Sequence, residues 1–228
     1  VWLGTYLGGL HRIKPAVVHV ISEAEGLRNR NVTGTYVDRS GAVWAGTWSQ
    51  GVSRIDPTTG RVQGFGSPAQ APSWGNVFFE GRDGTFWIGR RENDRDLYRC
   101  TRGASLACTE ELSAVGPLRG VLAIDEDADG RLWVGTTSGV YRRDRDRLVL
   151  LDTLVGAPRF PVRAFATSPD GAMWLGTNGG GVVRYREGVF TAITTGNGLP
   201  SNLIRALHVD RDGWLWIGTE GRGITRLD

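Results

Sequence analysis

The residues of this chain that could hold a metal ion lie in one acidic segment. Asp125, Asp127 and Asp129 alternate with other residues there, and Gly130 closes the segment. Calcium takes several oxygen ligands from one tight loop, so the segment is a candidate calcium site. The twelfth position of a calcium loop would be Thr136 instead of glutamate, so only half of the pattern is present. A plain acidic turn is the alternative interpretation.

Side chains for catalysis do not form a recognisable group. The histidines, which share no short metal-binding spacing, are His11, His19 and His208. No serine stands in a Gly-x-Ser-x-Gly nucleophile motif. Four aspartates recur at the same turn of their repeats, where a short carboxylate caps a hairpin: Asp38, Asp83, Asp170 and Asp212. We therefore expect a protein that is not an enzyme and that needs no cofactor, with calcium as the one possible exception.

The chain has two cysteines, Cys100 and Cys108, on two adjacent segments that read as strands. A hairpin through the intervening residues would place the two side chains opposite each other, close enough for a disulfide. A single disulfide and no other cysteine suit an exported protein. Two neighbouring buried thiols are the alternative, and without further ligands the pair is not a zinc site. We predict the disulfide.

The arrangement of charged and apolar residues argues against nucleic-acid binding and against a membrane-spanning segment. The net charge is +3 and the isoelectric point about 9.2, but the arginines alternate with acids, as in residues 142–147. A nucleic-acid footprint would gather the positive charge on one stretch or face. No run of about 18 apolar residues is present. We expect contact with a membrane only through flanking segments absent from this chain.

These side chains are carried by a repeat. Trp-x-Gly occurs six times at spacings of about 41 to 46 residues, and it accounts for six of the nine tryptophans. The repeats are centred on Trp2, Trp44, Trp87, Trp133, Trp174 and Trp216. Repeats of this length are typical of one propeller blade each.

Each repeat divides into four short strand-like segments. In the fifth repeat they are residues 162–167, 172–177, 182–185 and 189–193, separated by glycine-containing turns. In Trp-x-Gly, the tryptophan and the apolar x residue point to opposite faces, so both faces should be buried. The glycine should leave room for another backbone. We predict an all-β fold over residues 1–228, a β-propeller of four-stranded antiparallel blades with about six repeats. A solenoid of the same strands is the alternative.

The two ends fall in different repeats. The first repeat begins at its second strand, and the last stops after its third. Strands missing from two different blades cannot complete one blade together. We therefore expect an incomplete ring or a fragment of a longer propeller, which a second copy or a further propeller segment could complete.

Strand direction places two kinds of loop on one side of the blades, which we call the loop face. They are the loop after Trp-x-Gly-Thr and the connection into the next blade, whereas the Asp-Gly turns lie on the opposite side, the turn face. Loops on a rigid scaffold commonly bind ligands. The candidate ligand-binding residues are Tyr6, Arg28, Asn31, Trp48, Trp74, Arg90, Asn178, Asn202, Arg205, Glu220 and Arg222. The third repeat differs most, with Arg90 in place of threonine and a charged segment at 91–96.

The repeats resemble the two-component regulator propeller family. Residues 198–224 carry the fullest match, with Gly-Leu-Pro-Ser-Asn followed in order by Trp-Ile-Gly-Thr, and residues 26–52 form a second copy. The resemblance implies the extracytoplasmic sensor part of a bacterial membrane signalling protein, periplasmic or extracellular, with a small-molecule or oligosaccharide ligand. The chain is also somewhat similar to propeller lyases related to streptogramin lyase, which would make it an enzyme. A protein-interaction scaffold is the third hypothesis.

Overall fold

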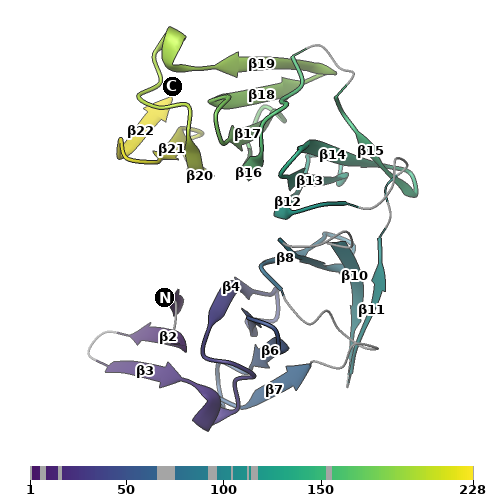
Figure 1. The fold of residues 1–228 in the computed structure, drawn as a ribbon, viewed down its shortest axis with the longest axis vertical. Helices are drawn as coiled ribbons and strands as arrows, with labels where there is room; N and C mark the ends of the chain where they lie inside the picture. Colours follow the sequence, from purple (N-terminus) through teal and green to yellow (C-terminus); the bar gives the residue numbers. More distant parts are fainter. Residues whose placement is uncertain are drawn as a thin grey trace. The chain divides into compact units, whose positions relative to one another are not determined.

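The computed structural model describes residues 2–5, 9–14, 17–65, 75–91, 97–103, 105–111, 113, 118–152 and 156–227. Within them the chain forms β-strands joined by turns and two single-turn 3-10 helices (Figure 1). The predicted all-β propeller fold is confirmed: the strands form antiparallel sheets of three or four, each built from consecutive segments. We number these sheets as blades 1 to 6 in chain order.

The chain divides into two compact units. The first unit comprises Val1–Arg90 and Leu97–Glu111, and it contains blades 1 to 3. Its strands are β1 (Trp2–Thr5), β2 (Gly9–Lys14) and β3 (Val17–Ile21) in blade 1, β4 (Val32–Val37), β5 (Val43–Thr47), β6 (Gly51–Ile55) and β7 (Val62–Phe65) in blade 2, and β8 (Val77–Glu80), β9 (Phe86–Gly89), β10 (Leu97–Arg102) and β11 (Leu106–Glu110) in blade 3. The helix η1 (Glu23–Glu25) lies between blades 1 and 2 in the sequence.

The second unit comprises Arg91–Asp96 and Leu112–Asp228, and it contains blades 4 to 6. Its strands are β12 (Val121–Glu126), β13 (Leu132–Thr136), β14 (Gly139–Asp144) and β15 (Arg147–Leu150) in blade 4, β16 (Val162–Thr167), β17 (Met173–Thr177), β18 (Val182–Arg186) and β19 (Val189–Ile193) in blade 5, and β20 (Ile204–Val209), β21 (Leu215–Thr219) and β22 (Ile224–Leu227) in blade 6. The helix η2 (Thr195–Asn197) connects blades 5 and 6.

The Trp-x-Gly segment forms the second strand of each four-stranded blade and is packed on both faces, as predicted. Trp44 and Ala45 are buried, as are Trp133 and Val134. Trp44 stacks among aromatic rings from its own blade and from blade 3 of the same unit, with Phe86 4.6 Å away between centroids. In blade 6, by contrast, Trp216 is 40% exposed. Burial of this tryptophan therefore depends on a neighbouring blade.

The glycine of Trp-x-Gly lies where the next blade approaches, which confirms the prediction. A β-carbon on Gly46 would stand 1.6 Å from the carbonyl oxygen of Gly75, and one on Gly135 would stand 2.5 Å from that of Val162. Both distances are far below contact, so no side chain fits. The repeated glycine thus lets the inner edge of one blade pack on the start of the next.

The four aspartates lie in the same hairpin turn of their blades, as predicted, but at two different positions in it. Asp38, Asp127 and Asp210 open their turns, whereas Asp83, Asp170 and Asp212 stand two residues later, as the hydrogen-bonding pattern shows. The opening aspartate also accepts a hydrogen bond from the indole Nε1 of the Trp-x-Gly tryptophan, at 2.9 Å, 2.9 Å and 2.7 Å in blades 2, 4 and 6. It therefore ties the turn to the buried ring.

The predicted disulfide between Cys100 and Cys108 is present. The two residues are direct cross-strand partners on β10 and β11 of blade 3. Closing this short loop restricts the unfolded chain, which by the chain-entropy account stabilises the native state by about 2–3 kcal/mol.

Reduction of this disulfide is expected to lower the free energy of unfolding by about 2–3 kcal/mol. Urea denaturation of oxidised and dithiothreitol-treated protein would measure the loss. A Cys100→Ala, Cys108→Ala variant is the control, because its stability should not respond to the reductant. Equal stability of oxidised and reduced wild-type protein would contradict the prediction.

Candidate functional site

Backbone hydrogen bonds fix the loop face of each unit. The backbone amide of the residue after Trp-x-Gly-Thr donates a hydrogen bond to the carbonyl of the residue just before the innermost strand of the same blade. The amide of Trp48 donates to Asn31 at 3.0 Å, that of Asn178 to Pro161 at 2.8 Å and that of Glu220 to Leu203 at 2.8 Å. The two kinds of loop therefore meet at one edge of each blade, as strand direction predicts. The threonine hydroxyl then closes the loop, as where Thr47 Oγ1 donates to the Gly51 carbonyl at 2.8 Å.

In the first unit, the loop face carries buried polar atoms without a hydrogen-bond partner among the described residues. They are Oδ1 of Asn31, Oδ1 of Asn76 and Nε of Arg90. Asn31 and Asn76 both stand immediately before the innermost strand of their blade, β4 and β8. Arg90 replaces the loop-closing threonine, and its Nη1 donates to the Tyr98 hydroxyl at 3.3 Å. Asn76 was missed by the sequence analysis, although aligning the repeats on their first strand would have paired it with Asn31.

Two other candidates of the first unit have different surroundings. Trp48 is exposed beside Asn31 and offers an aromatic surface. Arg28 instead holds the backbone, since its Nε donates to the Gln50 carbonyl at 3.0 Å. The remaining two, Tyr6 and Trp74, lie outside the described residues.

In the second unit, four candidates lie at the edge shared by blades 5 and 6. Asn202 serves the backbone: its carbonyl accepts from Gly179 and Gly181, and its Oδ1 accepts from the amide of Thr195 at 2.8 Å. Asn178 forms an isolated β-bridge with Leu203. Arg205 forms an ion pair with Glu220, with 2.6 Å between Nη2 and Oε2.

Two further arginines complete the candidate set of this unit. Arg222, the remaining sequence candidate, follows in the exposed turn between β21 and β22. Arg163, on β16, was missed by the sequence analysis, and its Nε is buried without a partner among the described residues. Burial and the charges of Arg205 and Arg91 lower the pKa of Arg163, against a smaller opposing effect of Glu220.

The acidic segment at 125–130 has the geometry of the plain-turn alternative. Asp127 Oδ1 accepts from the amides of Asp129 and Arg131, and its Oδ2 accepts from the indole of Trp133. Asp129 pairs with Arg131 at 3.1 Å, and Asp125 accepts from the next amide. Within the described residues, no group of three or more His, Cys, Asp or Glu side chains is arranged to hold a metal ion.

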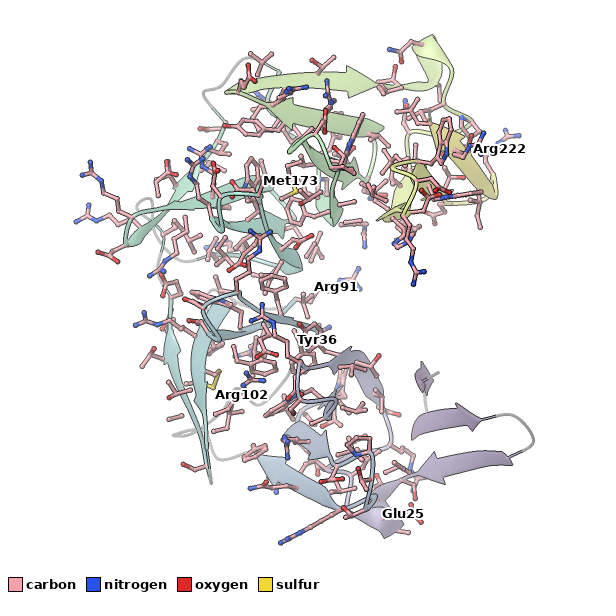
Figure 2. The ribbon with its side chains drawn as sticks, turned by 180° about the vertical axis from the view of Figure 1, so that it is seen from behind. Glu25, Tyr36, Arg91, Arg102, Met173 and Arg222 are labelled. Atoms are coloured by element: carbon pink, nitrogen blue, oxygen red, sulfur yellow. A yellow bond between two sulfur atoms is a disulfide. The ribbon has the colours of Figure 1, made fainter. Side chains whose placement is uncertain are left out.

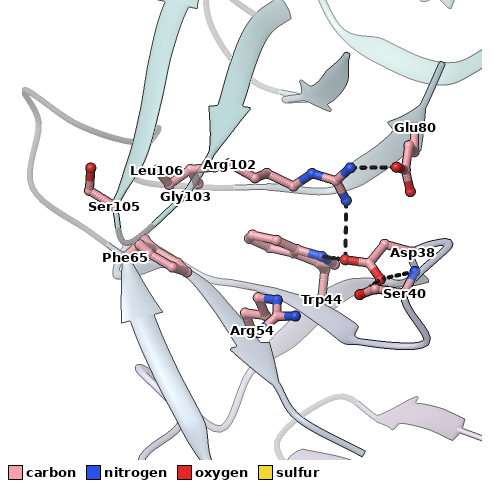
Figure 3. Close-up of a pocket in the computed structure, with 10 residues that line it drawn as sticks. All are labelled: Asp38, Ser40, Trp44, Arg54, Phe65, Glu80, Arg102, Gly103, Ser105 and Leu106. Atoms are coloured by element: carbon pink, nitrogen blue, oxygen red, sulfur yellow. Dashed lines mark hydrogen bonds and ion pairs between the residues drawn. The ribbon is translucent and has the colours of Figure 1, made fainter. Parts of the chain in front are cut away.

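A cavity of about 400 Å³ opens on the turn face of the first unit, between blades 2 and 3 (Figure 3). Three of its charged groups, Arg102, Asp38 and Glu80, are joined by ion pairs. Arg102 forms ion pairs with Glu80 and with Asp38, the latter at 3.1 Å, and its guanidinium lies 5.0 Å from the centroid of the Phe86 ring. Glu80 also accepts from the Arg39 amide at 2.8 Å. Figure 2 labels Arg102 and Tyr36, whose hydroxyl accepts from the Glu80 amide.

Asp38 is the most constrained carboxylate of this cavity. Burial acts to raise the pKa of Asp38, but hydrogen bonds from Ser40 and Trp44 outweigh it, so that the pKa is lowered. The Ala42 amide and the charge of Arg102 act in the same direction. The network of Arg102, Asp38 and Glu80 thus links two blades across this cavity.

A second turn-face cavity, of about 640 Å³, lies between blades 5 and 6 and includes Asp170. Hydrogen bonds from Ser168 and from the Ala172 amide, with the nearby Arg184, lower the pKa of Asp170 to about 2 against the opposing effect of burial. The carboxylate therefore favours the folded state while it is ionised.

The stability contributed by Asp170 should be present above about pH 4 and should be lost as the pH falls towards 2, because its folded pKa lies below the unfolded one. The side chain is 41% exposed, so solvent screening limits the effect to at most about 1 kcal/mol. Urea midpoints measured between pH 6 and pH 2.5 should fall less steeply for Asp170→Asn than for the wild type. Parallel profiles would contradict the assignment.

Comparison with known proteins agrees with the fold. The model of the two component regulator propeller family matches residues 116–138 and 198–221, that is, blade 4 and blade 6. A comparison with curated protein sequences found no match. The described part of the chain holds no helix with the length and hydropathy needed to cross a bilayer.

Several solved structures share the fold at low sequence identity. One is described as the extracellular domain of a hybrid two component system from B. thetaiotaomicron (20% identity, TM-score 0.81, 99% of this chain and 31% of that one). Another is PorZ, a surface component of the type-IX secretion system of Porphyromonas gingivalis (19% identity, TM-score 0.80, 99% of this chain and 36% of that one). Virginiamycin B lyase from Staphylococcus aureus is also similar (17% identity, TM-score 0.72, 99% of this chain and 79% of that one).

The chain spans about a third of the length of the first two of these structures. At these identities the likeness concerns the fold, which the three proteins share despite their different descriptions. Two segments of the chain, in blades 4 and 6, therefore match the two component regulator propeller repeat, and the solved structures agree with the propeller fold of the rest.

Proposed function

We propose that this chain is an extracytoplasmic sensor propeller of a bacterial signal-transduction protein, and that its loop face binds a small polar or sugar-like ligand. One observation carries the proposal: in the first unit, the buried side-chain atoms that have no hydrogen-bond partner among the described residues, at Asn31, Asn76 and Arg90, lie on the loop face. In the turn-face cavity of the same unit, Arg102 pairs with both Asp38 and Glu80. The extracellular neighbour from a two component system supports the assignment to signalling outside the cytoplasm.

The physical argument rests on the cost of unpaired buried groups. A buried amide or guanidinium atom without a partner costs free energy that a ligand's hydroxyl groups would recover on binding. The exposed indole of Trp48 beside Asn31 would add an apolar surface of the kind on which a sugar ring packs. A ligand that binds one orientation of the propeller more tightly than another would shift the population between them and so transmit a signal.

The principal alternative is a lyase, as for the virginiamycin B lyase neighbour. That hypothesis calls for a histidine and a carboxylate, with a metal ion, on the loop face. His208 lies opposite Trp216 near the turn-face end of β20, which favours the sensor. The side chains of His11 and His19 lie outside the described residues.

A thermal-shift panel of neutral and acidic sugars and small metabolites would test the proposal. We expect at least one compound to raise the melting temperature and to be recovered unchanged by mass spectrometry. The shift should weaken in Asn31→Ala, Asn76→Ala and should persist in Arg61→Ala, an exposed position in the turn-face hairpin between β6 and β7. Conversion of the compound would favour the lyase. If no compound of the panel raises the melting temperature and the chain instead binds a protein, an interaction scaffold would be favoured.

A further inference from the structure

The innermost strands of several blades carry a bulge at the same place, just inside the loop face. The register shifts between Val162 and Ala164 in β16 and between Ile204 and Ala206 in β20. The residue inside each bulge, Arg163 or Arg205, therefore has no partner on the adjoining strand. A bulge redirects a side chain away from the regular pleat, and such features often adjoin functional sites. The equivalent residues in blades 2 and 4 are Thr33 and Leu122, so the arginines are not demanded by the fold.

The two bulge arginines are neighbours, because β16 and β20 pack side by side in the second unit. They occupy the same position in consecutive blades, and a third arginine, Arg91, belongs to the same unit and acts on Arg163. Among the described residues, the acidic group that acts on Arg163 is Glu220, which is already paired with Arg205. Within this described part of the chain, the guanidinium groups of Arg163 and Arg205 thus share one carboxylate.

This arrangement is energetically unfavourable for the charged side chain of Arg163. Its Nε is buried without a partner among the described residues. Burial and two like charges lower the pKa of Arg163, yet an arginine stays protonated in proteins. The positive charge therefore persists in an environment that disfavours it. An anion placed between the arginines would relieve the repulsion and supply an acceptor to the Nε–H.

We propose that Arg163 and Arg205 bind an oxyanion, namely a carboxylate or sulfate group carried by the ligand of the loop face. The inference rests on the proposed function and adds the charge of the ligand. The planar guanidinium matches a carboxylate or sulfate in a two-point contact, which a neutral hydroxyl cannot offer. Glu220 orients Arg205 and leaves Arg163 as the group with an open donor.

Binding of glucuronate, glucose 6-sulfate and glucose to the chain would test the inference. Arginine Nε–Hε resonances in an isotope-labelled sample give a local readout, and titration gives the dissociation constant. We expect one or both acidic sugars to bind, to shift the Arg163 resonance and to bind at least about tenfold more tightly than glucose. Binding of glucuronate alone would identify a carboxylate as the recognised group, and binding of glucose 6-sulfate alone would identify a sulfate. Binding should weaken as salt is added.

The matched variants are Arg163→Gln and Arg211→Gln. Arg211 lies at the opposite end of β20, in the turn-face hairpin, and its replacement removes the same charge. We expect about tenfold or greater loss of acidic-sugar affinity in the first variant and no change in the second. Free Arg163→Gln should be at least as stable as the wild type, because the change removes a repelled charge. A folded Arg163→Gln variant is therefore expected.

The outcomes separate this inference from the proposed function. If glucose binds as tightly as both acidic sugars, or if Arg163→Gln keeps its affinity for them, the oxyanion site is overturned while a polar ligand-binding face stands. If neither the acidic sugars nor any compound of the wider panel binds, both the oxyanion site and the ligand-sensor proposal are overturned. A marked loss of stability in ligand-free Arg163→Gln would also count against the site, because it would show that the arginine serves the fold.

Discussion

Replacement of Gly46 by alanine is expected to prevent the first unit from folding. The added β-carbon would stand 1.6 Å from the carbonyl oxygen of Gly75. That carbonyl cannot retreat freely, because it accepts a hydrogen bond from Thr33 Oγ1 at 2.9 Å and the next amide, of Asn76, donates to Gly89 at 3.0 Å. A backbone clash of this size should cost more than about 4 kcal/mol. Urea denaturation followed by tryptophan fluorescence and circular dichroism would measure it.

The last blade offers a matched control, Gly218→Ala. Gly218 occupies the same place in Trp-x-Gly, but its nearest contact for an added β-carbon is Ala206 Cβ at 3.5 Å. Alanine fits there, and the expected change is less than about 1 kcal/mol, with stabilisation possible through the less flexible unfolded chain. Gly135→Ala, with a clash of 2.5 Å, should fall between the two. Equal losses at all three positions would contradict the steric explanation.

The strands could be predicted because their signals are local. In the fifth repeat the predicted segments 162–167, 172–177, 182–185 and 189–193 correspond to Val162–Thr167, Met173–Thr177, Val182–Arg186 and Val189–Ile193. Alternating apolar residues and glycine turns determine these segments without reference to the rest of the chain. The steric role of the motif glycine could also be inferred, because a glycine inside a strand generally marks a close approach.

The candidate site could be predicted only in part, because its decisive features depend on neighbouring strands. Asn31 and Arg90 were selected for their place in loops, yet their unpaired atoms become visible only when the blades are packed. Arg163 lies inside a strand and was missed, although aligning the repeats would have placed it at the position of the sequence candidate Arg205. Its importance comes from a bulge and from Arg205 on the next blade, and neither is encoded in the local pattern.

Arg102→Met is expected to destabilise the first unit by about 3–5 kcal/mol at neutral pH, the cost of breaking a buried ion pair. Arg102 is the shared partner of Asp38 and Glu80, whose side chains are only 2% and 6% exposed. Methionine preserves much of the packing against Phe86 but leaves two buried carboxylates facing each other. The control is Arg30→Met, because the ion pair of Arg30 with Glu23 is 62% and 41% exposed, so that water and salt screen it and its loss should change stability little.

The pH dependence of the Arg102→Met loss identifies its cause. In the wild type, Arg102 contributes to lowering the pKa of Glu80 and of Asp38 against the opposing effect of burial. Without the arginine, burial and the repulsion between Glu80 and Asp38 should raise the pKa of Glu80. Protonation of Glu80 should therefore recover more stability in the variant than in the wild type. The stability difference should therefore be largest near pH 7 and should shrink as the pH falls towards about 4. Glu80→Gln in the Arg102→Met background should recover part of the loss at neutral pH, because it removes one of the two unpaired charges. A loss that does not vary with pH, with no recovery in the double variant, would mean that Arg102 acts through packing instead of charge.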